Sequence, residues 1–196
     1  MEPFLRLDAV ALPIPIDNLD TDRILPARYL QKPRSAPFGD YLFRDWRCRP
    51  DGSPNPDFAL NQSAFEGARI IVGKRNFACG SSREHAVWAL YDHGFRCAIA
   101  ESFGDIFRSN AAKNGLLTVT LPAETIAQLL AGIAAVPGTR VTVDLTTQQV
   151  MTPDGAVHHF TVEPFTRQCL LEGIDELAYT LTQQDHIAAF ERTYTG

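Results

Sequence analysis

Residues 68–120 read ARIIVGKRNFACGSSREHAVWALYDHGFRCAIAESFGDIFRSNAAKNGLLTVT and contain three short apolar runs separated by two segments of helical pattern. Each apolar run has the length of a buried strand, and each helical segment places small or apolar residues on one face. The expected elements are strands at 68–73, 97–100 and 116–120 and helices at about 82–93 and 102–115. Strands that alternate with helices predict βαβ crossovers and a partly parallel sheet.

The flanking segments add further strands and helices. Pro13 and Pro15 favour an edge position for a strand over 8–16, because proline donates no hydrogen bond to a neighbouring strand. Two proline-rich stretches are expected to be loops, with a short helix near Trp46 between them. The other expected elements are loops at 31–39 and 48–57, a helix at 122–136, a strand at 139–145, a hairpin of 149–152 with 156–162, and helical structure over 165–196 that packs as a cap or interface. The sheet is therefore expected to be mixed, in one α/β domain spanning 1–196.

Composition is that of an ordinary globular protein, with 196 residues, 45% hydrophobic and 21% charged. The 18 basic and 23 acidic residues give a net charge of −5, and the basic residues form no run, which argues against nucleic acid as a partner. No apolar stretch reaches the ~18 residues of a membrane span, and the first ten residues do not resemble a signal peptide. These features predict a cytoplasmic protein without a membrane partner.

The four cysteines do not suggest a metal site in this chain. They stand at 48, 79, 97 and 169, without a C-x-x-C pair or a histidine at zinc-ligand spacing. The aspartate-rich stretch 17–26 lacks the pattern of a calcium loop, so we expect it to form a turn and a helix cap. No metal ligand is predicted.

Residues 73–86, GKRNFACGSSREHA, place a glycine, two serines and an arginine where a strand-exit loop meets a helix. Such a helix start attracts anions, and Arg83 adds a planar group suited to a carboxylate. A capping box, in which Ser81 and Glu84 satisfy the first turn of the helix, accounts equally well for the spacing. A phosphate loop is disfavoured because Lys74 precedes Gly80, and His85 is expected to be packed.

Several ordered motifs resemble the family of 3-isopropylmalate dehydratase small subunits, relatives of the aconitase swivelling domain. The most specific is the run from Gly80 to Ala86, GSSREHA. Others are found on both sides of it, so that the resemblance spans nearly the whole chain. They are NLDTD at 18–22 with ILP at 24–26, FG at 38–39, DWR at 45–47, NPDF at 55–58, SF at 102–103, IF at 106–107, Asn110 and NGLL at 114–117. Cys79 is typical of these small subunits, whereas aconitase carries an acidic residue there.

The resemblance implies a swivelling β/β/α fold and one half of a heterodimeric lyase. Such an enzyme interconverts 2-isopropylmalate and 3-isopropylmalate through the dehydrated alkene, in leucine biosynthesis. The partner would be a large subunit that holds a four-iron, four-sulfur (4Fe–4S) cluster with one iron open as a Lewis acid. No cofactor is expected on this chain, and the small-molecule substrate would be a dicarboxylate.

The resemblance also implies roles for individual residues. Ser81 falls at the position of the base that removes a proton next to a carboxylate, Arg83 at a carboxylate clamp, and Ser82 at a supporting hydrogen bond. With the resemblance included, the catalytic interpretation of Ser81 outweighs capping. Thr21 and Asp22 match positions beside the base, with Asp22 counted among the catalytic residues.

The loop at 31–39 is expected to select the substrate. Arg34 stands where a second carboxylate-binding arginine is expected, and an apolar patch could come from Tyr29, Leu30 and Phe38. Two alternatives remain open: a sister hydro-lyase subunit acting on citraconate (2-methylmalate) or homoaconitate, and a non-catalytic domain that binds an anion at the helix start.

Overall fold

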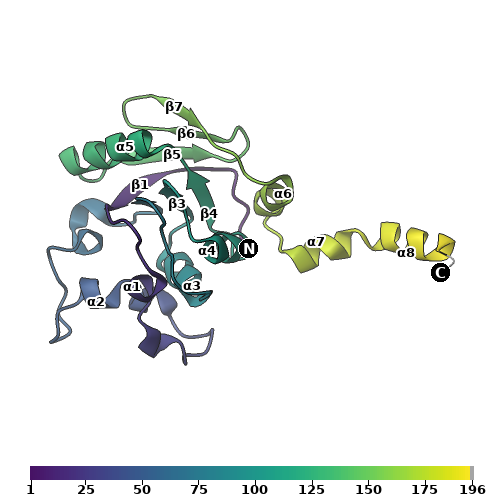
Figure 1. The fold of residues 1–196 in the computed structure, drawn as a ribbon, viewed down its shortest axis with the longest axis horizontal. Coiled ribbons are helices and arrows are strands. Elements are labelled where there is room, and N and C mark those ends of the chain that lie inside the picture. The colour runs from purple at the N-terminus through teal and green to yellow at the C-terminus, as the bar shows by residue number, and fades with distance from the viewer. Residues whose placement is uncertain (195–196) are drawn as a thin grey trace.

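The computed structural model describes residues 1–194 and contains a curled, mixed sheet in the order β4-β3-β2-β1-β5-β6-β7 (Figure 1). β1 to β4 pair in parallel, and β5, β6 and β7 continue the sheet in antiparallel pairing. The strands are β1 (Arg6–Ile14), β2 (Ile70–Gly73), β3 (Cys97–Ala100), β4 (Leu117–Thr120), β5 (Arg140–Asp144), β6 (Gln149–Met151) and β7 (Val157–His159). The predicted βαβ units and the mixed sheet are confirmed.

The edge position predicted for the first strand is wrong, because β1 lies at the centre of the sheet between β2 and β5. Its pairing with β5 ends at Val10, and Ala11 N–H still donates to the carbonyl of Thr139 at 3.0 Å. The nitrogen of Pro13 faces the same side two residues later, where β5 no longer runs alongside. A proline is therefore tolerated at this position of a central strand, because β5 has no carbonyl there that would need a hydrogen bond from the N–H that proline lacks.

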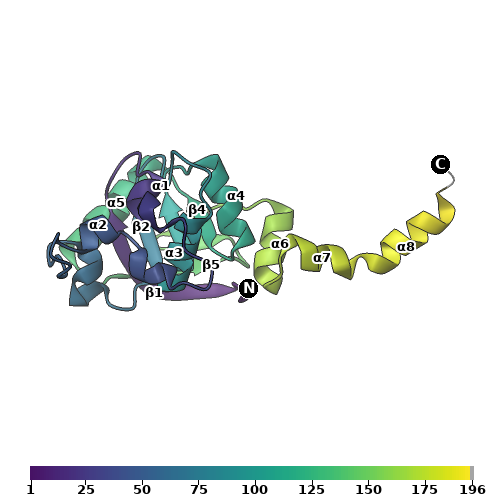
Figure 2. The same cartoon turned by 90° about the horizontal axis from the view of Figure 1, so that it is seen from below.

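The helices cover both faces of the sheet. α3 and α4 follow β2 and β3 and share a side with α1, whereas α5 packs against β1 and β2 from the opposite side (Figures 1 and 2). Their bounds are α1 (Thr21–Ile24), α2 (Arg44–Arg47), α3 (His85–His93), α4 (Asp105–Lys113), α5 (Ala123–Ala135), α6 (Pro164–Glu172), α7 (Glu176–Thr182) and α8 (Gln184–Thr193). The short helix expected near Trp46 is α2. The stretches 31–39 and 48–57 are loops, apart from the start of a 3-10 turn at Phe38–Tyr41.

The core is continuous and strongly apolar. Every residue of β2 and β3 is buried, and Phe77, Phe103 and Phe107 pack ring against ring beside them. Within residues 1–194, no buried side-chain nitrogen or oxygen lacks a hydrogen-bond partner. The exit of β2, which carries the proposed site, is thus built on a rigid base.

The C-terminal segment consists of three helices. α6 packs on the body, where Cys169 and Leu170 are buried and Phe4 N–H donates to the carbonyl of Leu170 at 2.8 Å. α7 and α8 bury no residue and extend away from the body (Figure 2). α6 thus packs on the body as predicted for a cap, whereas an interface role for α7 and α8 stays a prediction. The last two residues of the predicted segment lie outside the described residues. None of the helices described in the structure combines the length and apolarity needed to cross a membrane.

Candidate active site

The loop that leaves β2 is tightly bent and closely packed. Asn76, Ala78 and Gly80 have φ values of 57°, 56° and 101°, a left-handed conformation that costs energy for a residue with a Cβ atom. The backbone N–H of Asn76 donates to Oγ of Ser102 at 2.8 Å. A Cβ atom on Gly104 would lie 2.7 Å from the carbonyl oxygen of Ala78, so this approach requires glycine. These contacts hold the loop in a defined path toward Ser81.

The stretch before α1 runs beside this loop. Thr21 N–H donates to the carbonyl of Cys79 at 2.9 Å, and Cys79 N–H donates to the carbonyl of Leu19 at 3.0 Å. The carboxylate of Asp20 caps α1 by accepting from Arg23 N–H at 2.7 Å. The turn and cap predicted for this stretch are confirmed, and together these bonds place the Thr21 side chain next to Ser81.

Ser81 makes its side-chain contact with Thr21. Their hydroxyl oxygens lie 2.7 Å apart, and Thr21 itself is 1% exposed. α3 begins only at His85, its N-cap is Glu84, and no side chain caps it. The capping-box interpretation is therefore wrong, and so is the predicted start of the helix near residue 82. Ser81 is half-buried.

Arg83 and Asp22 form an ion pair at the mouth of this site. Nη1 of Arg83 donates to Oδ1 of Asp22, and their side chains are 25% and 54% exposed. Within the described residues, the other guanidinium nitrogens make no hydrogen bond, so they can still meet a carboxylate. Ser82 is exposed beside them, and its carbonyl accepts from Nδ2 of Asn110 at 3.4 Å.

Arg34 does not join this group. It makes a two-pronged contact with Asp92, at 2.7 and 2.9 Å, and lies over the ring of Trp88 with its guanidinium carbon 5.0 Å from the ring centre. Asp92 lies near the C-terminal end of α3, and at 1.5 Å per residue this is about 10 Å along the helix from His85. The structure thus brings together five of the six predicted site residues, Thr21, Asp22, Ser81, Ser82 and Arg83, and leaves Arg34 apart.

The apolar patch suggested for the substrate is only partly available. Phe38 is fully buried and packs against His85 and Trp88, with ring centres 5.6 and 5.4 Å away. Phe38 is therefore a core residue, which corrects the expectation that it meets the substrate. Tyr29 and Leu30 remain half-buried. The expectation that His85 is packed is confirmed by its ring contacts.

The cysteines do not form a ligand set. All four are free, and Cys97 and Cys169 are buried. Burial also raises the pKa of the Cys97 thiol, which disfavours the thiolate that a metal requires. In the part of the chain that the structure describes, no three histidine, cysteine or acidic side chains are grouped to hold a metal ion. Among residues 1–194, the four cysteines are therefore not grouped as the ligands of an iron–sulfur cluster would be.

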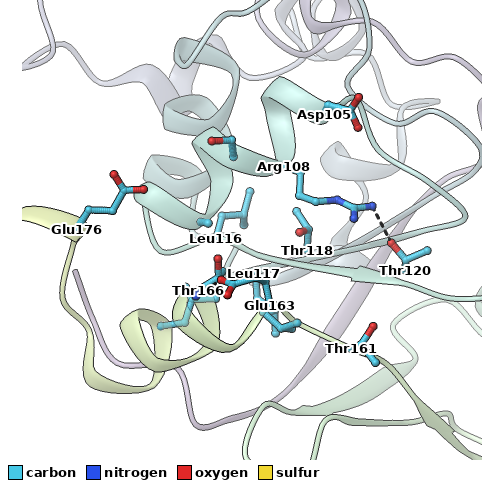
Figure 3. Close-up of a pocket in the computed structure, with 14 residues that line it drawn as sticks. Asp105, Arg108, Leu116, Leu117, Thr118, Thr120, Thr161, Glu163, Thr166 and Glu176 are labelled. Atoms are coloured by element: carbon cyan, nitrogen blue, oxygen red, sulfur yellow. Dashed lines mark hydrogen bonds between the residues drawn. The ribbon is translucent and has the colours of Figure 1, made fainter. Parts of the chain in front are cut away.

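A cavity of about 330 Å³ lies between α4, β4 and α6 (Figure 3), and Ser81 is not one of the residues that line it. Arg108 reaches into it and donates to Oγ1 of Thr120 at 3.2 Å. Three carboxylates, of Asp105, Glu163 and Glu176, also line it. This surplus of negative charge makes the cavity a poor site for a dicarboxylate.

Two sets of contacts around the site were not anticipated from the sequence. Asp92 is the partner of Arg34, and nothing in the spacing of these residues indicates the pair. Asn110 and Asn114 of the α4 region bind the segment 82–84, whereas the sequence reasoning used them only as family motifs. The helical pattern predicted over about 102–115 places Asn110 and Asn114 four residues apart on one face, which is the signal that could have indicated a shared role.

The mixed sheet, the sharply bent exit of β2 and the serine–arginine segment that follows it define an α/β domain of the aconitase C-terminal type. The family model described as "Aconitase C-terminal domain" matches residues 1–124, and a second model, LeuD_N, matches residues 127–164. A crystal structure of 3-isopropylmalate dehydratase from Methanocaldococcus jannaschii has the same fold, with a TM-score of 0.67 at 24% identity over 95% of this chain and 99% of that one. The predicted aconitase-like swivelling fold is confirmed.

Three curated relatives with the same name match nearly the whole chain. The 3-isopropylmalate dehydratase small subunit of Chloroflexus aurantiacus is 46% identical over 99% of this chain and 96% of its own length. Those of Roseiflexus sp. (strain RS-1) and Methylibium petroleiphilum are 47% and 46% identical over 97% of this chain, and 94% and 93% of their own lengths. The chain belongs to the family of 3-isopropylmalate dehydratase small subunits.

Proposed function

We propose that this chain supplies the proton-transfer half of a shared active site that interconverts 2-isopropylmalate and 3-isopropylmalate, a step of leucine biosynthesis. The observation that carries the proposal is the pairing of the Ser81 and Thr21 hydroxyls at 2.7 Å, with Arg83 two residues further along the chain. A proton acceptor and a carboxylate-binding group thereby stand side by side on one rigid loop.

The chemistry assigned to this chain is the removal and return of one proton. Arg83 binds a carboxylate of the substrate through the guanidinium nitrogens that Asp22 does not use. Ser81, as the alkoxide, accepts the proton from the carbon next to a carboxylate. The electron pair of that C–H bond forms the double bond as the neighbouring C–O bond breaks, giving 2-isopropylmaleate and a hydroxide. This hydroxide and the proton taken up by Ser81 together make up the eliminated water, and their recombination restores the alkoxide. Rehydration in the opposite sense, with hydroxyl and proton exchanged between the two carbons, yields the isomer.

A serine hydroxyl is a poor base in water, so its surroundings have to favour the alkoxide. A hydrogen bond donated by Thr21 Oγ1 stabilises the negative oxygen. The positive charge of Arg83 acts in the same direction, and both effects grow when a partner excludes water from the site. Thr21 suits this role because its burial and its backbone bond to Cys79 leave its hydroxyl little freedom.

The remaining site residues have supporting roles in this proposal. Asp22 orients Arg83 through their ion pair, and exposed Ser82 donates a hydrogen bond to the bound dicarboxylate. Arg34 binds the second carboxylate only after it leaves Asp92. The loop that carries it therefore has to change its contacts when substrate binds.

The partner in this proposal is the large subunit of the enzyme. Asp22 and Ser82 are exposed, so the site needs a second surface to close it. We place the 4Fe–4S cluster on that subunit, where it supplies a Lewis acid for the hydroxyl group. Every other role in this proposal is carried out by a residue of this chain.

The proposal is tested by mixing this chain with the large subunit. This chain alone, a cluster-loaded large subunit alone, and the two together are assayed anaerobically for dehydration of 3-isopropylmalate, citraconate hydration and turnover of homoaconitate. Activity with isopropylmalate only in the mixture is the expected result. A verified complex that prefers citraconate or homoaconitate would instead assign the chain to a sister hydro-lyase, and failure to form any complex would favour the anion-binding module.

A further inference from the structure

Asn114, directly after α4, makes three side-chain hydrogen bonds, two of which reach α3 or its N-cap and one of which stays within the α4 region. Its Nδ2 donates to Oε1 of Glu84 at 2.7 Å and to the carbonyl of Asn110 at 2.8 Å. Its Oδ1 accepts from Nε1 of Trp88 at 3.1 Å. Because an indole nitrogen can only donate, Trp88 fixes which end of the amide faces it, and the NH₂ group must then face Glu84.

Asn114 binds the carboxylate of Glu84, whose position in the chain is close to the proposed site. It directly follows Arg83, the proposed clamp for a carboxylate. The structure pairs Arg83 with Asp22 and binds Glu84 to Asn114, and among the described residues Glu84 takes part in no ion pair. A carboxylate released at this point would compete with the substrate for Arg83 or repel it.

The geometry points to a positioning role for Asn114, and this inference rests on the proposed function. Asn114 holds the Glu84 carboxylate against α4 and thereby keeps Arg83 available to the dicarboxylate. Glu84 is the N-cap of α3, and its carbonyl accepts from the N–H groups of Val87 at 2.9 Å and Trp88 at 3.1 Å. The helix therefore fixes the backbone of Glu84, whereas Asn114 holds its carboxylate. Nδ2 of Asn110 supports the segment 82–84 through the carbonyl of Ser82.

The experiment is a double-mutant cycle in the assembled enzyme. Asn114→Ala, Glu84→Gln and the double variant are each combined with the large subunit, and KM and kcat for 3-isopropylmalate are measured beside the wild type. Asn114→Ala is expected to raise KM about fivefold while kcat changes less than about twofold, since coupling between contacting charged groups is of this size. In the double variant KM should return to within about twofold of the wild type, because the competing charge is gone.

A matched control separates positioning from general loss of stability. Asn61 also makes two side-chain hydrogen bonds, to the carbonyls of Arg47 and Asn55 at 2.7 Å each, far from Arg83 along the chain. Asn61→Ala should leave KM unchanged even where it lowers the Tm. An unchanged KM in Asn114→Ala, or a rise that Glu84→Gln does not relieve, would overturn the inference.

Two further measurements keep the test decisive. If Asn114→Ala does not assemble, Asn114→Asp keeps the side-chain shape and replaces the amide donor with a carboxylate that repels Glu84. The same rise in KM, and the same relief by Glu84→Gln, are expected. If the wild-type complex does not turn over isopropylmalate, the proposed function is contradicted, and this inference falls with it. If the wild-type complex is active but Glu84→Gln does not restore KM in the Asn114 variants, this inference alone is contradicted.

Discussion

The hydroxyl oxygens of Ser81 and Thr21 lie 2.7 Å apart although the residues are 60 positions apart in the chain. Two backbone hydrogen bonds between the 19–21 stretch and Cys79 create this contact. A serine hydroxyl that could have capped a helix is bound to a buried threonine instead. This contact rules out Ser81 as the cap of α3 and supports its proposed role in proton transfer.

Thr21→Val should lower kcat of the assembled enzyme by about tenfold or more, because the hydrogen bond that stabilises the Ser81 alkoxide is lost. Valine has nearly the same shape, so the free energy of unfolding should fall by only ~1 kcal/mol. Steady-state kinetics and a denaturant titration measure both effects. An unchanged kcat would mean that Thr21 has a structural role only.

Arg83→Lys should raise KM for isopropylmalate about tenfold and lower kcat, since an ammonium group cannot reproduce the two-pronged contact with a carboxylate. Arg28→Lys is the matched control, because Arg28 makes a similar pair with Asp45 elsewhere on the surface. The control should keep wild-type kinetics. If both variants behave alike, Arg83 does not bind the substrate.

Arg34→Lys and Asp92→Asn together determine whether Arg34 reaches the substrate. If it does, Arg34→Lys raises KM several-fold, while Asp92→Asn leaves KM unchanged or lowers it by releasing Arg34 from its partner. We expect this asymmetric result. Equal losses of Tm without any change in KM would restrict the pair to a structural role, because both substitutions break the same contact.

The stability of the fold should depend on the protonation of His93. Burial, together with the nearby charge of Arg47, lowers the pKa of His93 below its ordinary value. The unfolded chain then binds the proton more readily, so the stabilising contribution is complete above about pH 6.5 and is lost as the pH falls below that value and through the lower pKa of the folded state. His93→Gln should reduce the slope of unfolding free energy against pH between about 7 and 5. The exposed His159 offers a control substitution, His159→Gln, that should retain the wild-type slope.

The elements of this fold were largely predictable, since buried strands and amphipathic helices leave a local pattern. The order of strands was less so. Pro13 indicates an edge strand, but it lies in the central strand β1. The pairing of β1 with β5 ends at Val10, before Pro13, and the sequence does not reveal where this pairing ends. The predicted start of α3, near residue 82, lies three residues before the observed one, because the local pattern does not show that Glu84 is the N-cap and that its side chain is bound by Asn114.

The site was predictable in part for the same reason. Ser81, Ser82 and Arg83 are contiguous, so a local motif identifies them. Their pairing with Thr21 and Asp22 depends on a parallel bridge between Asp20 and Cys79 that spacing does not reveal. The contact of Arg34 with Asp92 joins a loop to a helix end and leaves no sequence pattern at all.

The most direct test of the account is the turnover of isopropylmalate by the assembled enzyme carrying Ser81→Ala. Complex formation is verified by analytical ultracentrifugation, and Ser53→Ala, which removes a hydroxyl that binds only Asp51, serves as the control. The account predicts an intact complex with kcat reduced by about a hundredfold or more, as for loss of a general base. A complex with Ser81→Ala that retained wild-type turnover would contradict the assignment of proton transfer to this chain.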